Sequence, residues 1–358
     1  MKYIDAIDYK LEIGSLEESS FSQLLESYVN RKKVIIVDDN THEHCLPYLI
    51  TTFQELSDAE VILLPEGEEN KQMSIAYSVW EALTDYTVSR NDLIINLGGG
   101  MITDLGGFIA SCYKRGCDFI NIPTSLLGMV DASIGGKTGI NLGHFKNQIG
   151  VFSNPKTVYI DPIFLTTLPD EEMKSGYAEM LKHGLISNKN LFFEIIEQLE
   201  NYKELDIEFL GVSLSIKNEV VKNDPLEKGL RKILNYGHTI GHVIEGHYME
   251  TLNLSHGHAV AIGMVMEAFL SKKEGKLSEG DYKKIESNIL KHFKIPTFSD
   301  DDIKSMTEML INDKKNDSGE IKCCLLSAIG KCSFDNVIPE ERFIETFMHF
   351  KNLQVNLN

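Results

Sequence analysis

Residues 93–112 read LIINLGGGMITDLGGFIASC, and this stretch decides the fold class of the first half of the chain. A mostly apolar run (93–97), with Asn96 as its one polar residue, leads through three glycines (98–100) into a helical stretch that ends near Cys112. Strands that are apolar throughout are typical of parallel sheets covered on both faces, and bare backbone amides at a strand-to-helix turn can bind a pyrophosphate. Thr103 stands where the full dinucleotide-binding fingerprint needs its third glycine, so a tight turn explains the glycines equally well.

Three further apolar runs flank this stretch, at residues 34–37, 61–64 and 119–122, and helix-like segments separate them. The alternation predicts a doubly wound, Rossmann-like α/β domain whose ligands lie beyond the carboxyl ends of the strands. Asp38 follows the first of these runs, where it can accept hydrogen bonds from a ribose diol or cap the next helix.

The second half of the chain has a different pattern. Apolar residues recur with helical spacing in six long segments, and residues 319–334 could form a small hairpin. The helical segments cover residues 171–186, 190–201, 207–222, 236–250, 258–274 and 280–293. We therefore expect an α/β domain at residues 1–161 and a mostly α-helical domain at residues 162–358.

Composition excludes several classes of protein. The 358 residues include 35 Lys and Arg against 53 Asp and Glu, and the net charge of −18 disfavours binding to nucleic acid or to anionic membranes. No apolar run reaches about 18 residues, the first residues lack the pattern of a secretory signal, and none of the six cysteines forms a C-x-x-C pair. We expect a protein of a reducing compartment, the cytoplasm.

Residues 123–150 are rich in glycine, serine and threonine, yet too apolar for a solvated linker. Residues 111–150 carry four Lys or Arg against two Asp, a local positive charge within an acidic chain. We interpret this stretch as a pocket for a small anion rather than a surface loop, because long structureless loops are usually functional.

Histidines provide the strongest metal signal. His238 and His242 are four residues apart and share one helix face, and His256 and His258 follow after a short gap. Glu179 could add an oxygen ligand. Two or three nitrogens with a carboxylate and an open position are typical of a catalytic zinc site. The alternative is that some of these histidines are core or capping residues, which is the interpretation we favour for His258.

Cations in the second half suit an anionic ligand. Lys182 lies one helical turn after Glu179 and faces the same side. Arg231 suits bidentate carboxylate binding, whereas lysines bind phosphate as point charges. Taken singly, the remaining cations are ordinary surface charges, namely Lys217, Lys314 and Lys315.

Six segments of the sequence are motifs that are specific when they occur together. They are GGGMITDLGGFIASCYKRG, PTSLLGMVDASIGGKTGIN, FKNQIG, GYAEMLKHG, DPLEKGLRKILNYGHTIGHVIE and SHGHAVAIGM, which begin at residues 98, 123, 145, 176, 224 and 255. In this order, over roughly residues 30–330, the chain resembles the 3-dehydroquinate synthases, a family of sugar-phosphate cyclases. The resemblance implies an NAD-binding α/β domain, a helical metal-binding domain, an active site in the cleft between them, and a homodimer in which Arg115 reaches the partner's site.

The resemblance also implies roles for individual residues. The metal ligands would be Glu179, His238 and His256. NAD would contact Asp38, Asn40, Glu68, Lys71, Gly99, Gly100, Met101, Ile102, Thr103, Asp104, Thr124 and Ser125, with further contacts from Phe164, Thr167, Leu168 and Glu172. The substrate carboxylate would bind Lys217, Arg231 and Asn235, and the phosphate and nicotinamide would lie near Lys137, Lys146 and Asn147, with Lys314 or Lys315. The candidate catalytic groups around the substrate hydroxyls would be Asp131, Lys182, Glu227 and His242, together with Lys137.

Two positions depart from the family's usual pattern. Ser125 stands where a second threonine is usual, and His258 stands where glutamate is common. The serine keeps the hydroxyl, whereas the histidine changes a contact next to the metal ligands.

The implied substrate, 3-deoxy-D-arabino-heptulosonate 7-phosphate, is anionic at both ends, and the implied product is 3-dehydroquinate. Zinc or cobalt would polarise substrate hydroxyls, and His242 would be the candidate base. NAD would take one hydride, phosphate would leave, and the hydride would be returned. An aldol closure would then form the ring. Three alternatives remain: another sugar-phosphate cyclase, an NAD-dependent, metal-assisted alcohol or polyol dehydrogenase, and a non-catalytic sensor of NAD or metal.

Overall fold

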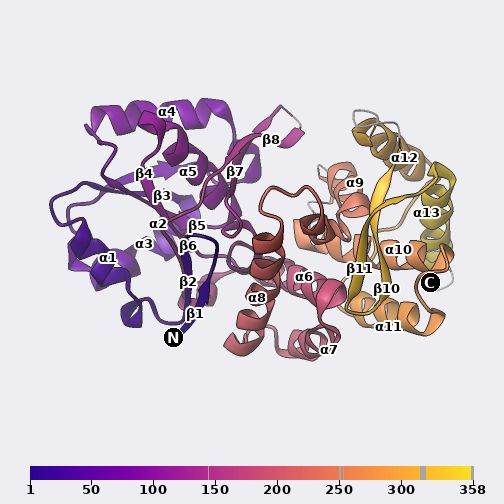
Figure 1. Cartoon of the computed structure of the whole chain (residues 1–358). Coiled ribbons are helices and arrows are strands. Elements are labelled where there is room, and N and C mark those ends of the chain that lie inside the picture. Colours follow the sequence, from indigo (N-terminus) through magenta and orange to yellow (C-terminus); the bar gives the residue numbers. More distant parts are fainter. Residues whose placement is uncertain (144, 250, 253, 315–319, 356–358) are drawn as a thin grey trace. The chain divides into compact units, whose positions relative to one another are not determined.

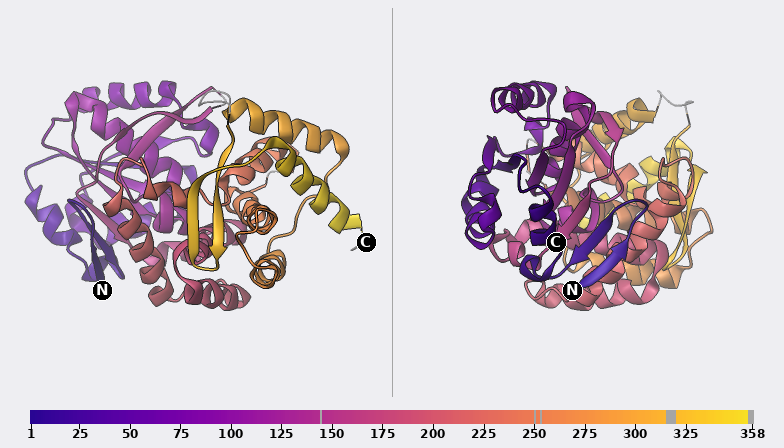
Figure 2. Two further views of the ribbon diagram at one scale, coloured as in Figure 1. Left: turned by 45° about the vertical axis from the view of Figure 1, so that its right-hand side comes forward. Right: turned by 60° about the vertical axis from the view of Figure 1, so that its left-hand side comes forward.

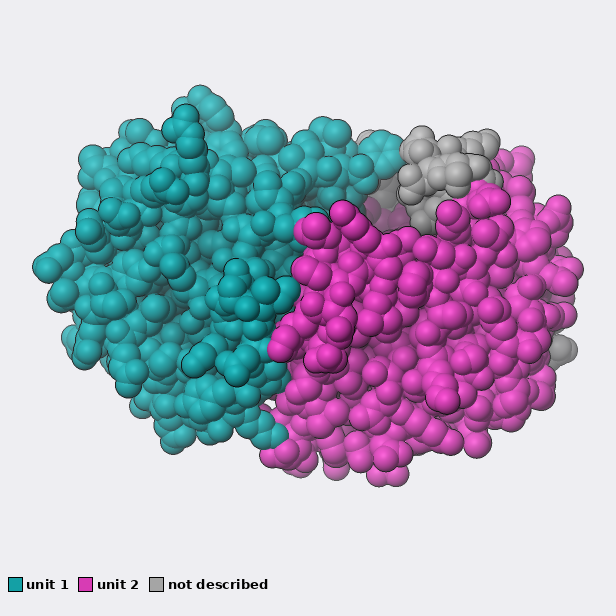
Figure 3. Space-filling model, in the orientation of Figure 1, with its two compact units in different colours: residues 1–173 teal, residues 174–358 magenta. Residues whose placement is uncertain are grey.

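The computed structural model describes residues 1–143, 145–249, 251–252, 254–314 and 320–355. The chain divides into two compact units, Met1–Met173 (unit 1) and Lys174–Asn358 (unit 2), which are coloured separately in Figure 3. Each unit has a fold of its own.

The division lies later in the chain than the boundary predicted at 161/162. The intervening residues are tied to unit 1. Asp161 accepts a hydrogen bond from the amide of Leu16 (2.7 Å), and the ring of Phe164 packs edge-on against Tyr48 at 5.7 Å between centroids.

One sheet in unit 1 carries its described strands in the order β1-β2-β9-β6-β5-β3-β4. All of these strands except β9 are labelled in Figure 1. Neighbouring strands are parallel except β1 and β2, which pair antiparallel at one edge (Figure 2, right). The strands are β1 (Lys2–Asp5), β2 (Lys10–Ile13), β3 (Lys33–Asp38), β4 (Glu60–Leu64), β5 (Leu93–Gly98), β6 (Asp118–Pro123) and β9 (Thr157–Ile160). The four apolar runs of the sequence are β3, β4, β5 and β6, so the predicted doubly wound α/β fold is confirmed.

Helices cover both faces of this sheet (Figure 1). Right-handed crossovers place α1 (Phe21–Ser27), α2 (Asp39–His44) and α3 (Leu46–Thr52) on one face, and α4 (Met73–Asp85) and α5 (Gly100–Cys112) on the other. The core under α4 and α5 is mainly aliphatic, with Val34, Ile94 and Leu105 among its residues, and also contains aromatic rings such as Phe108 and Phe119.

Helix α5 is buried on nearly all sides because a second layer covers it. The hairpin of β7 (Lys137–Leu142) and β8 (Phe145–Phe152) contacts α5, which also contacts β5 and β6. A Cβ on Gly107 would lie 2.6 Å from Cγ2 of Thr138, so the helix and the hairpin approach each other closely.

This hairpin occupies part of residues 123–150, where the sequence suggested a structureless loop, and that expectation was wrong. Ile140 and Ile149 of the hairpin pack against the core of unit 1, and the two strands also pair at very close backbone distance. Gly139 lies opposite Gly150, and a Cβ on Gly150 would lie 2.2 Å from the carbonyl oxygen of Thr138. The anion pocket expected in this segment stays a prediction.

Unit 2 is mostly helical, as predicted. Its described helices are α6 (Asp170–Ser187, which begins in unit 1), α7 (Lys189–Gln198), α8 (Ile207–Asn223), α9 (His238–Tyr248), α10 (His256–Lys273), α11 (Glu279–Leu290), α12 (Asp300–Lys314) and α13 (Glu340–Val355). Helix α10 is the centre of the unit. It contacts α9, α11 and α13, and residues 259–271 of α10 are all buried.

The hairpin suggested for residues 319–334 is present as β10 (Lys322–Ala328) and β11 (Lys331–Val337), and β10 packs against α10 (Figure 2, left). Among the described residues, none of the helices combines the length and apolar character that crossing a bilayer requires.

Candidate functional site

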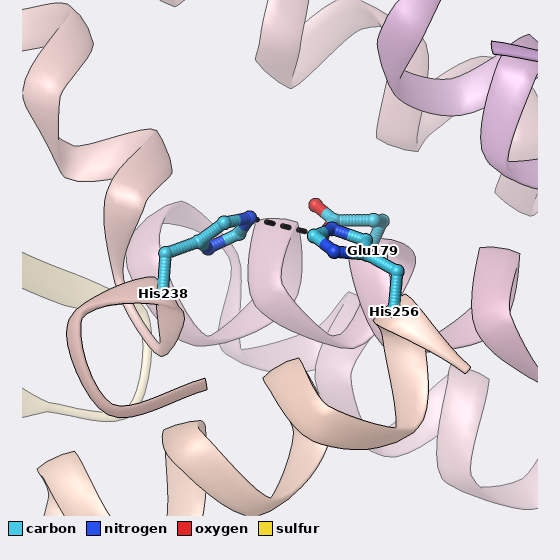
Figure 4. Close-up of side chains that lie close together, drawn as sticks. All are labelled: Glu179, His238 and His256. Atoms are coloured by element: carbon cyan, nitrogen blue, oxygen red, sulfur yellow. Dashed lines mark ion pairs between the residues drawn. The ribbon is translucent and has the colours of Figure 1, made fainter. Parts of the chain in front are cut away.

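Three side chains from three helices of unit 2 converge on one point (Figure 4). Glu179 comes from the middle of α6, His238 is the first residue of α9, and His256 is the first residue of α10. Nε2 of His238 lies 3.5 Å from Oε1 of Glu179, and Nε2 of His256 lies 3.8 Å from the same oxygen. One donor atom from each residue lies within 4.8 Å of the other two.

This spacing fits a divalent metal ion. Zinc bonds of about 2.0–2.2 Å place tetrahedral donors about 3.3–3.6 Å apart. Glu179 is fully buried, and its Oε1 accepts no hydrogen bond from any residue that the structure describes. Such a buried oxygen needs a cation or a donor, and the partly exposed imidazoles leave room for an exogenous ligand. The donor set has the chemistry of a catalytic metal centre.

The other ring nitrogens of the two histidines have partners that set the tautomer. Nδ1 of His238 lies 3.3 Å from the carbonyl oxygen of Tyr236, and Nδ1 of His256 lies 3.2 Å from Oε2 of Glu245. Both partners accept a hydrogen bond, so each Nδ1 carries the proton and each Nε2 keeps its lone pair for a metal.

Lys182 lies one turn after Glu179 on α6 and forms an ion pair with Oε2 of that residue. The two side chains are 2% and 0% exposed. The carboxylate therefore has one oxygen committed to an ammonium and the other directed to the histidines.

His242 lies beside the donor set, with its ring centroid 5.1 Å from that of His238 and 5.8 Å from that of His256. It also forms a second group of close donors with Glu245 and His256. We favour the group that contains Glu179, because Oε1 of that carboxylate has no hydrogen-bond donor among the described residues.

His258 points elsewhere, in line with the structural role favoured for it. Its Nε2 donates to the carbonyl oxygen of Lys294 (2.8 Å), and its ring packs edge-on against Phe293. The side chain thus ties the start of α10 to the segment after α11.

The residues implied for a substrate carboxylate lie on α8 and on the 3-10 helix Leu230–Asn235. Arg231 and Lys217 are 2% and 4% exposed, so the expectation that Lys217 is an ordinary surface charge was wrong. Nη1 of Arg231 donates to the carbonyl oxygen of Pro225 (2.7 Å). A guanidinium and an ammonium buried on contacting elements suit an anionic ligand.

Asn235 and Glu227 are brought together nearby, since Nδ2 of Asn235 donates to Oε1 of Glu227 (2.9 Å). Glu227 has a φ of +56°, which is unusual for a residue with a side chain and is typical of functional sites. The side chain of Lys314 and all of Lys315 lie outside the described residues, so their expected phosphate contact stays a prediction.

In unit 1, three charged residues implied for NAD form one cluster. Nζ of Lys71 lies 2.7 Å from Oε1 of Glu68 and 3.1 Å from Oδ2 of Asp104. Burial lowers the pKa of Lys71, but the two carboxylates outweigh it and raise that pKa. Burial raises the pKa of Asp104 to about 6 despite the opposing effect of Lys71.

The start of α5 and the end of β6 are adjacent. Gly99 is the N-cap residue of α5 and has no side chain, so the leading amides of the helix are left for an external acceptor, as a pyrophosphate requires. The amide of Thr124 donates to the carbonyl oxygen of Gly98 (3.1 Å), and a Cβ on Gly99 would lie 3.2 Å from Oγ of Ser125. The first turn of α5 carries the other expected contacts, Gly100, Met101, Ile102 and Thr103.

Asp38 takes the capping role that the sequence left open. Its Oδ1 accepts from the amide of Thr41 (2.8 Å) in a capping box at the start of α2, and Asn40 donates to Glu66. Contact of Asp38 and Asn40 with a ribose stays a prediction.

The remaining expected residues of unit 1 are spread over six elements. Asp131 lies in the π-helical turn Gly128–Ala132, Lys137 begins β7, Lys146 and Asn147 lie on β8, and Arg115 is exposed at the end of the turn Tyr113–Arg115. Phe164 and Thr167 belong to the 3-10 helix Pro162–Thr167, Leu168 follows it, and Glu172 lies in the first turn of α6.

Sequence comparison identifies the family to which these features belong. Residues 61–175 match the family model described as 3-dehydroquinate synthase N-terminal, and residues 176–316 match the model described as 3-dehydroquinate synthase C-terminal. The chain belongs to the 3-dehydroquinate synthase family.

Two curated members of the 3-dehydroquinate synthase family illustrate the similarity. The chain is 38% identical over 340 residues to a 3-dehydroquinate synthase of Parabacteroides distasonis, covering 93% of this chain and 95% of that protein. It is 43% identical over 325 residues to one of a Sulfurovum species, covering 90% of each. A solved 2-deoxy-scyllo-inosose synthase, complexed with carbaglucose-6-phosphate, NAD+ and Co2+, is similar with a TM-score of 0.83 and 26% identity over 97% of this chain and 99% of that one.

The family resemblance did not point to two buried carboxylates of this member, Glu245 and Glu267. Glu245 is seven residues after His238, two turns along one helix face, and that spacing is the signal that could have found it. Glu267 is eleven residues after His256, three turns along the same helix, but the sequence does not relate it to His238.

Proposed function

We propose that the chain is a 3-dehydroquinate synthase, which converts 3-deoxy-D-arabino-heptulosonate 7-phosphate into 3-dehydroquinate and inorganic phosphate in the shikimate pathway. The observation that carries the proposal is the convergence of Glu179, His238 and His256 in a chain that matches both halves of the family. The product feeds chorismate and aromatic amino acid biosynthesis.

The cofactors we propose are NAD and a divalent metal ion, Zn2+ with Co2+ as a substitute. When bound, the metal ion acidifies substrate hydroxyls, and the dinucleotide accepts and returns one hydride. We assign the metal and the substrate carboxylate to residues 162–358 and most of the NAD contacts to residues 1–161. The bare amides at the start of α5 and the charged cluster of Lys71, Glu68 and Asp104 suit the dinucleotide's phosphates and hydroxyls.

The two anionic ends of the substrate would have separate binding groups. Arg231, Lys217 and Asn235 bind the carboxylate, an assignment supported by the burial of the two cations. The phosphate is held by cations and an amide, namely Lys137, Lys146 and Asn147, with Lys314 or Lys315. Binding both ends holds the reacting carbons in one orientation, which is the main contribution of the protein to the rate.

His242 is the proposed proton acceptor for the substrate hydroxyl that is oxidised. It adjoins both ligand histidines and is exposed, so a substrate can reach it. Lys182, Asp131 and Glu227 orient the remaining hydroxyls.

We further propose a homodimer in the cytoplasm. Lys114 and Arg115 both have positive φ (48° and 67°), and consecutive strained residues that present an exposed arginine are typical of a functional contact. Arg115 would complete the site of the partner subunit. All six cysteines are free thiols, as expected in a reducing compartment.

The test is to incubate the purified protein with the heptulosonate phosphate, zinc and NAD+ at a small fraction of the substrate concentration, and to follow phosphate and nicotinamide absorbance together. A synthase releases phosphate in large excess over NAD+ without net NADH. A dehydrogenase would accumulate NADH without phosphate release, and another cyclase would leave this substrate unchanged. Either result would contradict the proposal.

A further inference from the structure

Glu267 is a fully buried carboxylate on α10 to which none of the expected roles applies. Its Oε2 accepts a hydrogen bond from the amide of Gly237 (2.8 Å), and its Oε1 accepts one from the amide of Ile240 (3.2 Å). These amides belong to the first turn of α9, which begins at His238 and has no side-chain cap of its own. Glu267 thus supplies, from another helix, the anion that a helix N-terminus favours.

The peptide group between Tyr236 and Gly237 connects this carboxylate to His238. Its N–H donates to Glu267, and its carbonyl oxygen accepts from Nδ1 of His238 (3.3 Å). One planar peptide therefore carries a hydrogen bond on each side, and linked hydrogen bonds of this kind polarise one another.

We propose that Glu267 is a positioning residue for the metal centre, which acts on His238 through the Tyr236–Gly237 peptide. The inference rests on the metal centre of the proposed function. In this arrangement each ligand histidine has a carboxylate on the Nδ1 side of its ring, away from the metal. Glu245 accepts directly from Nδ1 of His256, whereas Glu267 fixes the peptide that accepts from Nδ1 of His238.

The surrounding packing leaves this peptide little freedom. The hydroxyl of Tyr236, which is fully buried, donates to the carbonyl oxygen of Met264 (2.7 Å). Gly237 has a φ of +84°, and a Cβ at this position would lie 3.0 Å from the carbonyl oxygen of Val260. Glu267 is therefore one of several contacts with α10 that fix this peptide, and it is the one that bonds to the N–H of the peptide whose carbonyl oxygen accepts from His238.

The experiment measures zinc affinity of the full-length protein by competition with a chromophoric chelator, which does not require turnover. Glu267→Gln preserves volume but replaces one acceptor oxygen with a donor facing an amide. We expect zinc binding to weaken about 10–100-fold, the range for partners behind a metal ligand, and the d–d absorption of the Co2+ protein to shift. Glu245→Gln, the direct counterpart, should weaken binding to a similar degree.

Asn188→Ala is the matched control. Asn188 also caps a helix of unit 2 by accepting two amide hydrogen bonds, but it caps α7, which carries none of the three ligands. It should lower the melting temperature while changing zinc affinity less than twofold. A folded Glu267→Gln protein with wild-type zinc affinity, or with a loss no greater than that of Asn188→Ala, would overturn the inference.

Two measurements separate this inference from the proposed function. If His238→Ala leaves zinc affinity unchanged, the metal centre itself is wrong. If His238→Ala abolishes binding and Glu267→Gln does not affect it, only the role of Glu267 is wrong.

Should Glu267→Gln fail to fold, the wild-type protein still tests the inference. The Gly237 amide proton should be protected from exchange and should change its NMR shift when zinc binds, and a rapidly exchanging amide would overturn it.

Discussion

Lys182 and Glu179 form an ion pair one helical turn apart on α6, and both side chains are buried in unit 2. A buried ammonium compensates a buried carboxylate only as long as both are present. Lys182→Met should therefore destabilise the metal-free protein by about 3–5 kcal/mol, because it leaves the Glu179 charge without its partner.

Zinc should restore much of this loss, because the metal supplies positive charge to the same carboxylate. The thermal shift produced by zinc should thus be larger in Lys182→Met than in the wild type, as scanning calorimetry can show. Lys291→Met is the control, since Lys291 pairs with Glu200 at the surface and should matter little. Equal zinc shifts in Lys182→Met and the wild type would argue against a shared carboxylate.

Metal binding should depend on His256 and not on the neighbouring His258. His256→Ala should lower bound zinc from about one equivalent to a small fraction, because a three-donor site loses a nitrogen. His258→Ala should keep the zinc but lose about 1 kcal/mol of stability with its hydrogen bond to Lys294. Elemental analysis of the dialysed proteins distinguishes the two variants. Full zinc content in His256→Ala would show that the ligand set is wrong.

Arg231→Ala should act mainly on substrate affinity. Removing a buried guanidinium from a carboxylate contact costs about 2–3 kcal/mol, which corresponds to a rise in KM of roughly 30–150-fold with a smaller change in kcat. Steady-state kinetics provides the test, with Arg342→Ala, on the exposed side of α13, as the control. An unchanged KM in Arg231→Ala would exclude the carboxylate role.

Stability should fall with rising pH because of Asp104, whose pKa is raised to about 6. Below pH 4 both the folded and unfolded chains hold the proton. Between about pH 4 and 6 the unfolded chain releases it first, so the folded state is progressively disfavoured, and above pH 6 the difference is constant. The melting temperature of the wild type relative to Asp104→Asn should decline from pH 4.5 to pH 7. Parallel curves would show that Asp104 does not titrate in this range.

Arg115 should act across a dimer. Arg115→Ala and His256→Ala should each be inactive alone. Mixed in equal amounts and allowed to exchange subunits, they should recover roughly a quarter of wild-type activity, because half of the dimers carry one intact site. A fully active monomer, or no recovery despite subunit exchange, would rule out a shared site.

Four of the seven described strands of the central sheet could be predicted because burial on both faces leaves a mostly apolar run, as in residues 34–37, or in residues 93–97 with Asn96 as the one polar residue. Strands β1, β2 and β9 were not predicted. β1 is an edge strand in which partly buried and exposed residues alternate within four positions, and so short a pattern is weak. The hairpin of β7 and β8 left no periodic signal either, because backbone contact at Gly139 and Gly150 determines its pairing.

The candidate metal donors could be selected by residue type and helical spacing, but their convergence could not. Glu179 precedes His238 by almost 60 residues, and only the packing of α6, α9 and α10 brings them together. Glu267 is an example of a residue whose role the sequence does not reveal. In the sequence it is one acidic residue in an apolar helix, and its relation to Gly237 depends on how α9 and α10 cross.

The two helices that carry the ligand histidines touch along their main chains. A Cβ on Gly263 of α10 would lie only 2.0 Å from the carbonyl oxygen of Gly237, just before α9. The distance between the two ligand histidines is thus determined by direct contact between two backbones and not by adaptable side chains. A methyl group at position 263 would force these two backbones apart and so widen the spacing between His238 and His256. The ligand residues themselves would be unchanged, so position 263 is the place to alter the size of ion that the site accepts.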